Sequence, residues 1–400
     1  MANGNSETAG IFIGRSILGI LFTVVFLDNL GFAIVVPYLF FYVVALGGSP
    51  FLYGVLLASY SLMSFVFTPT VARLSDRFGR RKILLIGLAV SGISYVIFGA
   101  GQAIWVLFAG RTLAGTTAAT VPVAQAYIAD VTIPAKRLRY LGLLGAAAGV
   151  AFIFGPAIGG TLSDLFGYGL PSFLAASLAF TNLVLAYFRL PEPSSFNIKR
   201  TVIPLAALLK IFRERRIVLL LSTYFMFFVA FVFMQAALSP WLQVVFGFGS
   251  FQVGLVFFFI GGFSVVTQAV LLPVFSKKFS QLHLTLVSIG VFALGLLVLG
   301  WVQNLAFLFA VAALTAFGFG IQYVMFNTLI SLSTSDDAQG GTLGIAWAIA
   351  GLAQTIAPIL AASVFSFGVS LGFDGLVFVA SAAISVATVP LVLGFKKASE

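Results

Sequence analysis

One carboxylate, Asp28, lies in the apolar stretch 26–37, which belongs to a hydrophobic segment long enough to cross a bilayer. A charge inside such a segment costs several kcal/mol, roughly 2.5–3.5 on insertion scales, so an ionisable residue there indicates a functional site. A lone carboxylate in that position can exchange a proton or balance a cation. Asp28 is therefore the first candidate functional residue.

An arginine, Arg111, is the second charged residue inside a hydrophobic segment. It begins a stripe of small and polar residues at helical spacing, made of Gly115, Ala118, Pro122 and Gln125. Such a stripe suits a cavity wall, and a guanidinium that stays charged needs a carboxylate, carbonyls or water. Counting from the nearest loop puts Arg111 about 9 Å and Asp28 about 13 Å below one surface. We expect a direct or water-bridged interaction, with a purely structural ion pair as the alternative.

Composition places these residues in a polytopic membrane protein. Hydrophobic residues make up 61% and charged residues 8% of the 400 residues, and no soluble domain covers that much apolar surface. The net charge of +10 then indicates membrane orientation, and we expect no nucleic-acid partner. Without cysteine, and with His283 as the single histidine, we expect no metal site and no other cofactor. Residues 1–8 lack a signal-peptide pattern.

Apolar segments of about 20 residues, the length that crosses a bilayer, recur along the chain. They predict an all-α fold of twelve transmembrane helices in two six-helix bundles. The expected spans are 15–40, 51–72, 83–101, 104–128, 140–163, 170–189, 216–238, 251–275, 283–301, 304–330, 341–366 and 372–394. The expected domains are an N-terminal bundle at 1–190, a central loop at 191–215 and a C-terminal bundle at 216–400. Within the loop, 205–215 predicts a short interfacial helix.

The basic residues indicate the orientation of these spans. With twelve spans, every Lys and Arg except Arg111 falls on one face of the membrane. The positive-inside rule then puts both termini and the central loop in the cytoplasm, and we expect a location in the plasma membrane. A miscounted helix would scatter these charges over both faces, so the pattern also supports the count.

The two halves of the chain repeat each other at an offset of about 200 residues. Matching positions are Gly142, Gly149 and Pro156 with Gly344, Gly351 and Pro358. An even number of spans in each half makes this a parallel repeat about an axis along the membrane normal. Transporters built in this way bind their substrate near the bilayer midplane, between the halves.

The loop between the second and third spans carries a charged motif. It reads Ala72-Arg73-Leu74-Ser75-Asp76-Arg77-Phe78-Gly79-Arg80-Arg81 and resembles the cytoplasmic signature of the major facilitator superfamily. The resemblance implies that Asp76 meets the N-terminus of the eleventh span, near Gly340 and Gly341, where free N–H groups stabilise an anion. A plain topogenic basic loop is the alternative, but it requires neither Asp76 nor Gly79.

A second acidic motif follows the fourth span. Asp130 and the basic residues after it are similar to the family's arrangement at the cytoplasmic end. The resemblance implies a gating charge network, away from the substrate, formed by Asp76, Arg77, Arg80, Asp130 and Arg137. Arg111 likewise resembles the buried arginine of the family's fourth-span motif.

Further motifs resemble the drug:proton antiporter branch of this family. The fifth span contains Gly155-Pro156-Ala157-Ile158-Gly159-Gly160, and the first span repeats the Asp-x-x-Gly-x5-Pro pattern of tetracycline-efflux-like antiporters. Small residues let helices approach closely; packing alone is the alternative role. The expected helix-packing residues are Gly149, Gly155, Pro156, Gly159 and Gly160, with Gly142 and Gly145 on the same helix. Some carriers of this branch use further carboxylates in the third and ninth spans, but here these spans contain no acidic residue. The sequence therefore does not support transport of a metal–tetracycline chelate or a proton relay of several acids.

The resemblance implies a secondary transporter, without enzymatic activity, that exports lipophilic small molecules by alternating access in exchange for protons. The energy source is then the proton gradient, the partners are the substrate, protons and the lipid bilayer, and we expect a monomer. Asp28 and Arg111 are the expected proton-coupling residues. The substrate-cavity candidates are Asn29, Phe32, Gln125, Gln235, Tyr323, Asn327, Trp347 and Gln354.

Two other classes of function stay open. A proton-linked or facilitative importer of a sugar or other small metabolite can also carry an acid in its first span. Against it, the seventh span has the single glutamine Gln235, and the cavity candidates include few hydroxyl-reading side chains. A membrane-embedded enzyme or a receptor has little support, because no nucleophile–base pair, metal cluster or appended soluble domain is visible.

Overall fold

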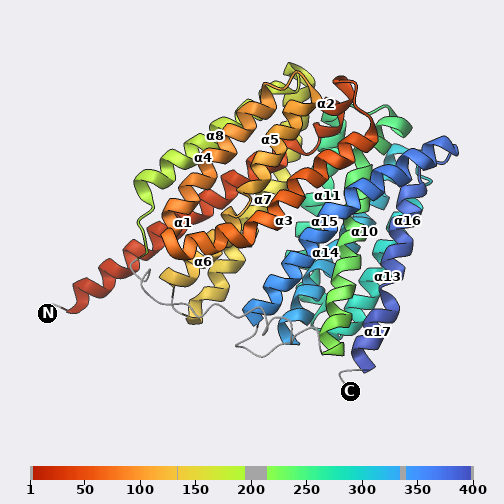
Figure 1. Ribbon diagram of the computed structural model, residues 1–400. Coiled ribbons are helices and arrows are strands. Elements are labelled where there is room, and N and C mark those ends of the chain that lie inside the picture. Colours follow the sequence, from red (N-terminus) through yellow and green to blue (C-terminus); the bar gives the residue numbers. More distant parts are fainter. Residues whose placement is uncertain (1–2, 133, 194–213, 334–338, 398–400) are drawn as a thin grey trace. The chain divides into compact units, whose positions relative to one another are not determined.

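The computed structural model describes residues 3–132, 134–193, 214–333 and 339–397 (Figure 1). Every regular element in these ranges is a helix, which is the structure that satisfies all backbone polar groups within one membrane segment. Eleven helices of the described residues are long and apolar enough to cross a membrane. The predicted all-α membrane fold is confirmed.

Contacts divide the chain into two compact units. The first contains Met1–Tyr42 and Met63–Arg200, and the second contains Val43–Leu62 and Thr201–Glu400. The helices α2 (Leu39–Ala45) and α3 (Pro50–Phe78) contribute residues to both units. The other helices of the first unit are α1 (Asn3–Val35), α4 (Arg80–Gly99), α5 (Ile104–Thr116), α6 (Thr120–Val131), α7 (Pro134–Phe166) and α8 (Gly169–Arg189).

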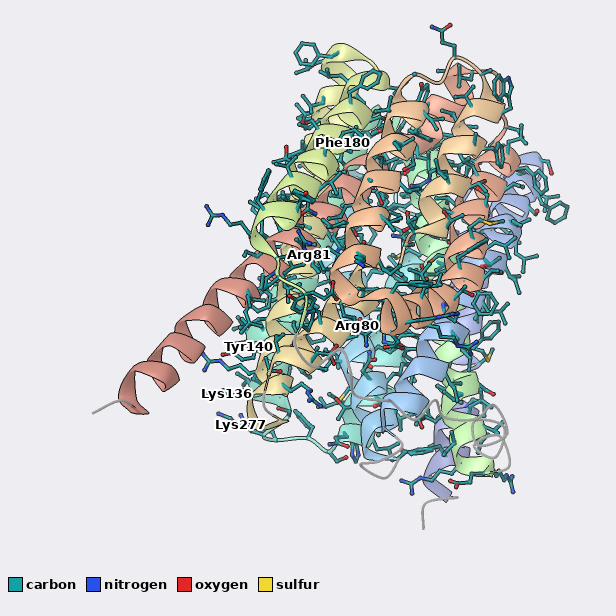
Figure 2. All side chains as sticks on the ribbon, turned by 60° about the vertical axis from the view of Figure 1, so that its left-hand side comes forward. Arg80, Arg81, Lys136, Tyr140, Phe180 and Lys277 are labelled. Carbon is teal, nitrogen blue, oxygen red and sulfur yellow. The ribbon has the colours of Figure 1, made fainter. Side chains whose placement is uncertain are left out.

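Helix α1 is the central element of the first unit. It packs against α7 and α8, while α4 runs beside α8 and α5 (Figure 1). The α4–α8 contact is close, because a Cβ atom on Gly92 would lie 2.7 Å from the ring of Phe180, which is labelled on α8 in Figure 2. At the end of α1, the hydroxyls of Tyr38 and Ser172 are 2.7 Å apart, which ties this corner to α8.

The fourth predicted span is interrupted, contrary to the prediction of one helix over 104–128. Helix α5 ends at Thr116 and α6 begins at Thr120, with a tight turn in which the Ala119 N–H donates to the Thr117 carbonyl at 2.7 Å. Pro122 explains the break, because proline has no N–H and its ring clashes with the carbonyl four residues earlier, here that of Ala118. Each half is therefore too short to count among the eleven long helices.

The glycines of α7 differ in their surroundings. Gly155 and Gly159 lie against α1, where an added Cβ would overlap Ala33 and the Ile34 carbonyl respectively. Added Cβ atoms at Gly142 and Gly145 would meet nothing within 4 Å. The close α1–α7 approach therefore depends on the second half of the glycine-rich segment.

The second unit is built in a similar way from its own helices. They are α10 (Arg215–Phe246), α11 (Ser250–Val266), the π-helix Thr267–Leu271, α12 (Leu272–Phe275), α13 (Gln281–Leu299), α14 (Leu305–Leu332), α15 (Gln339–Ser370), α16 (Leu376–Val386) and α17 (Val389–Lys397). Helix α10 packs against α15, and α13 packs along α14. At that second contact a Cβ on Gly318 would lie 2.5 Å from the Phe292 nitrogen. Most of the predicted interfacial helix at 205–215 falls outside the described residues.

Substitution of the two kinds of glycine on α7 should separate packing from helix propensity. We expect Gly159→Ala to destabilise the fold by about 1–3 kcal/mol, because overpacking forces the α1 backbone to move. Gly145→Ala is the matched control, and we expect it to be neutral or slightly stabilising, since alanine favours a helix more than glycine does. Thermal unfolding of the purified proteins measures both, and equal melting temperatures for the two variants would contradict the assignment.

Candidate functional site

Asp28 lies on α1 near the middle of the membrane segment Ile17–Val35 and is half-buried. The hydroxyl of Thr120, the first residue of α6, lies near enough to act on this carboxyl group. The break in the fourth span therefore places the start of a helix beside the carboxylate. The N-terminus of a helix carries unpaired N–H groups and a partial positive charge, so this environment suits an anion.

Arg111 lies on α5, is 3% exposed and points toward aromatic rings. Its guanidinium carbon is 5.4 Å from the centre of the Phe32 ring, and its charge acts on Tyr38. It also lines a small recess with Val35, Ser94, Tyr95, Phe98, Gly110 and Ala114. A guanidinium over an aromatic face is attracted by the ring electrons.

The ion pairs between described residues do not include one between Asp28 and Arg111. The predicted direct or water-bridged contact between Asp28 and Arg111 stays a prediction. The sequence does not predict Thr120 as a neighbour of the carboxylate, where the structure places it. The signal in the sequence is Pro122, which lies two residues after Thr120 and explains the interruption of the fourth span.

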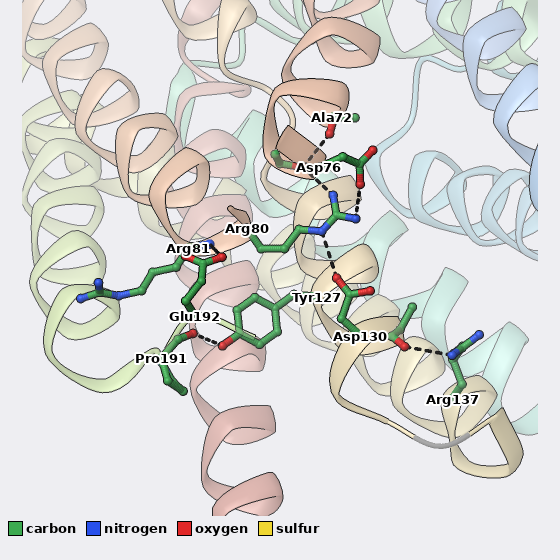
Figure 3. A network of polar contacts seen from close by, with 11 residues as sticks. Ala72, Asp76, Arg80, Arg81, Tyr127, Asp130, Arg137, Pro191 and Glu192 are labelled. Carbon is green, nitrogen blue, oxygen red and sulfur yellow. Dashed lines mark hydrogen bonds and ion pairs between the residues drawn. The ribbon is translucent and has the colours of Figure 1, made fainter. Parts of the chain in front are cut away.

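At the end of the first unit where α3 meets α4, Arg80 joins two carboxylates (Figure 3). Its Nε lies 3.1 Å from Asp130 Oδ2, and its Nη2 is paired with Asp76. Its Nη1 donates to the Ser75 hydroxyl at 2.6 Å. Arg80 is 5% exposed, so this side chain depends on these partners: a buried charge that loses its partner is strongly destabilising.

Gly79 and Glu192 complete this end of the unit. Gly79 has a φ of 104°, in the region that favours glycine, and an added Cβ would lie 2.7 Å from the Glu192 carboxylate. The Arg81 N–H, in the first turn of α4, donates to Glu192 Oε1 at 3.3 Å. The Tyr127 hydroxyl donates to the Pro191 carbonyl (Figure 3). The segment after α8 is thus held at the start of α4, a role the sequence analysis did not assign.

The five predicted gating residues are only partly brought together. Asp76, Arg80 and Asp130 form one network, whereas Arg137 donates to the Ala129 carbonyl at 2.9 Å. Arg77 is exposed and lies over the Phe78 ring at 5.3 Å. The helix backbone at Gly340 and Gly341 is described, but their surroundings are not, so the predicted partner of Asp76 stays a prediction. A gating role for the network stays a prediction as well.

The cavity candidates of the first unit have the following contacts. Asn29 donates to the Val25 carbonyl of its own helix at 2.8 Å. Phe32 meets Phe152 edge to face, with ring centres 5.9 Å apart, and Gln125 is exposed. Phe32 is therefore the candidate that links Asp28's helix to Arg111.

In the second unit, two of the candidates form a polar group with Tyr224. Asn327 donates to the Tyr323 carbonyl at 2.7 Å and accepts from the Tyr224 hydroxyl at 3.4 Å. Gln235 and Gln354 are half-buried, and Trp347 is 49% exposed. Tyr224 was missed because its segment is apolar throughout and gives no periodic polar signal.

The described residues form a helical membrane fold with the carboxylate of Asp28 inside a span and a buried charge network at one end of the first unit. Residues 21–358 match the family model of the Major Facilitator Superfamily. The chain therefore belongs to the major facilitator superfamily.

Several named relatives resemble the chain over most of its length. Tetracycline resistance protein, class C, of Escherichia coli is 32% identical over 346 residues, which are 84% of this chain and 86% of that protein. Multidrug resistance protein 1 of Bacillus subtilis is 27% identical over 370 residues, which are 89% of this chain and 91% of that protein.

Solved structures agree with the fold. The human organic anion transporter MFSD10 has a TM-score of 0.69 at 20% identity and covers 95% of this chain and 99% of its own. A D-xylose–proton symporter has a TM-score of 0.76 at 17% identity, with coverage of 95% and 99%. At these identities the likeness shows the fold alone.

The Arg80 network yields a stability prediction. We expect Arg80→Ala to destabilise the first unit by about 3–5 kcal/mol, because it removes the buried cation that joins Asp76 and Asp130. Arg73→Ala, near the end of α3 and exposed, is the matched control and should change stability by less than about 0.5 kcal/mol. Thermal unfolding of the purified protein compares the two variants. A similar melting temperature for both would show that the network does not stabilise the fold.

Proposed function

We propose that this protein is a proton-coupled antiporter that exports lipophilic small molecules by alternating access. The observation that carries the proposal is the Asp28 carboxylate, which lies half-buried inside the first span. It is supported by the relatives whose names record tetracycline and multidrug resistance. Likeness to a sugar symporter supports only the shared fold, and nothing at the site favours a sugar.

Asp28 is the proposed exchange site for protons. When its cavity is open to the outside, the carboxylate takes up a proton from water. In the inward-facing state, substrate competes for the same carboxylate, and the proton leaves to cytoplasmic water. A carboxylate can alternate in this way because its charge is costly in a dry environment and is stabilised by water or a cationic group. With one exchanging acid in the spans, this route carries about one proton per cycle.

Arg111 and Phe32 have a supporting role in the proposed mechanism. The guanidinium stays charged throughout the cycle, and its position over the Phe32 ring holds that ring one helical turn from Asp28. The substrate would then meet an aromatic surface and a carboxylate together. This combination suits a lipophilic molecule with a cationic or zwitterionic group.

The proposed substrate does not depend on a bound metal ion. The described residues contain no group of three or more His, Cys, Asp or Glu side chains that could hold one, and α4 and α13 contain no acid. We therefore propose a lipophilic organic substrate in place of a metal chelate. The proton gradient is the proposed energy source.

The proposed setting is the plasma membrane, with both termini in the cytoplasm and the protein acting as a monomer. The basic residues support this orientation through the positive-inside rule. Arg80 and Arg81, labelled in Figure 2, then mark the cytoplasmic end of the first unit.

The test is proton-gradient-driven uptake of a fluorescent lipophilic cation into inverted membrane vesicles. We expect Asp28→Asn to reduce uptake to background, because asparagine mimics the protonated carboxyl and offers substrate no carboxylate to compete for. Asp164→Asn, at an exposed acid, is the matched control and should transport normally. Undiminished uptake by Asp28→Asn would overturn the proposal, and counterflow with sugars in place of cations would establish the importer.

A further inference from the structure

We propose that Thr120 is a positioning residue for proton exchange at Asp28. Its hydroxyl, placed by the interruption of the fourth span, holds the carboxyl group in both of its protonation states. This inference rests on the proposed function of Asp28 and adds the partner on which that function depends.

The register of α1 against α6 places the two residues face to face. The two helices run in opposite directions (Figure 1) and contact each other. Val24 of α1 and Ala124 of α6 belong to one buried cluster. Four residues further along α1 is Asp28, and four residues back along α6 is Thr120. The influence of the Thr120 hydroxyl on the Asp28 carboxyl group agrees with this register.

The break also frees the Thr120 hydroxyl for this contact. Threonine hydroxyls inside helices usually bond to a carbonyl of the preceding turn. Thr116 bonds in this way to the Leu113 carbonyl at 2.7 Å, and Thr117 bonds to the Ala114 carbonyl at 3.3 Å. Among the hydrogen bonds of the described residues, none joins the Thr120 hydroxyl to such a carbonyl. Thr120 is 6% exposed, so water does not compete freely for it.

The chemistry of a hydroxyl suits a carboxyl group that must titrate. A hydroxyl has one donor and two acceptor sites, so it donates to the ionised Asp28 and accepts from the protonated one. An arginine only donates and stays charged, so a direct partner of that type would hold Asp28 in the ionised form. In the exchange itself, the O–H bond of the Asp28 carboxyl breaks and the proton passes to water. Thr120 keeps its own proton throughout.

Few other titratable or charged groups face Asp28. On α4, Tyr95 lies 3.4 Å from where a Cβ on Gly31 would be, one turn from Asp28. On α5, Arg111 is directed at Phe32. The charged residues of the other helices packed against α1 lie toward the ends of those helices and are Asp130, Lys136, Arg137, Arg139, Asp164 and Arg189. Thr120 is therefore the polar neighbour whose loss should act most directly on the carboxyl group.

The experiment measures proton release from purified full-length protein on addition of tetraphenylphosphonium, as a function of pH. Thr120→Val keeps the shape of the side chain and removes the hydroxyl. The ionised carboxylate then loses a donor and keeps its proton to higher pH. We expect the pH of half-maximal release to rise by about one unit. Thr120→Ser should retain the wild-type midpoint, and so should the control Thr117→Val.

Two outcomes would overturn the inference: a wild-type midpoint in Thr120→Val, or the same shift in Thr120→Ser as in Thr120→Val. A merely structural role would lower transport at every pH without moving the midpoint. If the valine variant does not fold, Thr120→Ala takes its place. Asp28→Asn separates the two proposals. Proton release that persists in Asp28→Asn contradicts the proposed function. If Asp28→Asn loses proton release but Thr120→Val keeps the wild-type midpoint, only the role of Thr120 is contradicted.

Discussion

The proximity of the Thr120 hydroxyl to the Asp28 carboxyl group is the feature on which the proposed site depends. A carboxylate inside a membrane segment is costly unless polar groups surround it. Here the polar groups come from a helix that proline interrupts at the depth of the carboxylate. The same break that shortens the fourth span thus supplies a hydroxyl and the N-terminus of α6. The glycines of α7 hold α1 against the bundle on its other side, because Gly155 and Gly159 allow backbone contact.

The charges of the first unit form two sites with different chemistry. Arg80 is buried between Asp76 and Asp130, so this site consists of paired opposite charges. Asp28 has a neutral hydroxyl as its neighbour. In the proposed mechanism, the Arg80 network stays structured while the Asp28 carboxyl group exchanges protons.

The sequence predicts the class of fold, the position of Asp28 inside a span and the meeting of Asp76 with Arg80, because composition and motif spacing carry that information. It does not predict the partner of Asp28. Counting residues along a helix gives the expected depth of Arg111 but not the direction of its side chain. That direction depends on packing. The sequence predicts a continuous helix through the break before Pro122, because a three-residue turn does not change the periodicity of the residues around it. The contact of Glu192 with Gly79 joins segments too distant in the chain for local patterns to link.

The most direct test of this account is difference infrared spectroscopy of the purified protein with and without substrate, in wild type and in Asp28→Asn. The account predicts that a protonated carboxyl band disappears when substrate binds, at a pH where protons are released, and that the asparagine variant lacks this change. A band that persists on substrate binding, or one that disappears equally in Asp28→Asn, would contradict the claim that Asp28 exchanges its proton for substrate.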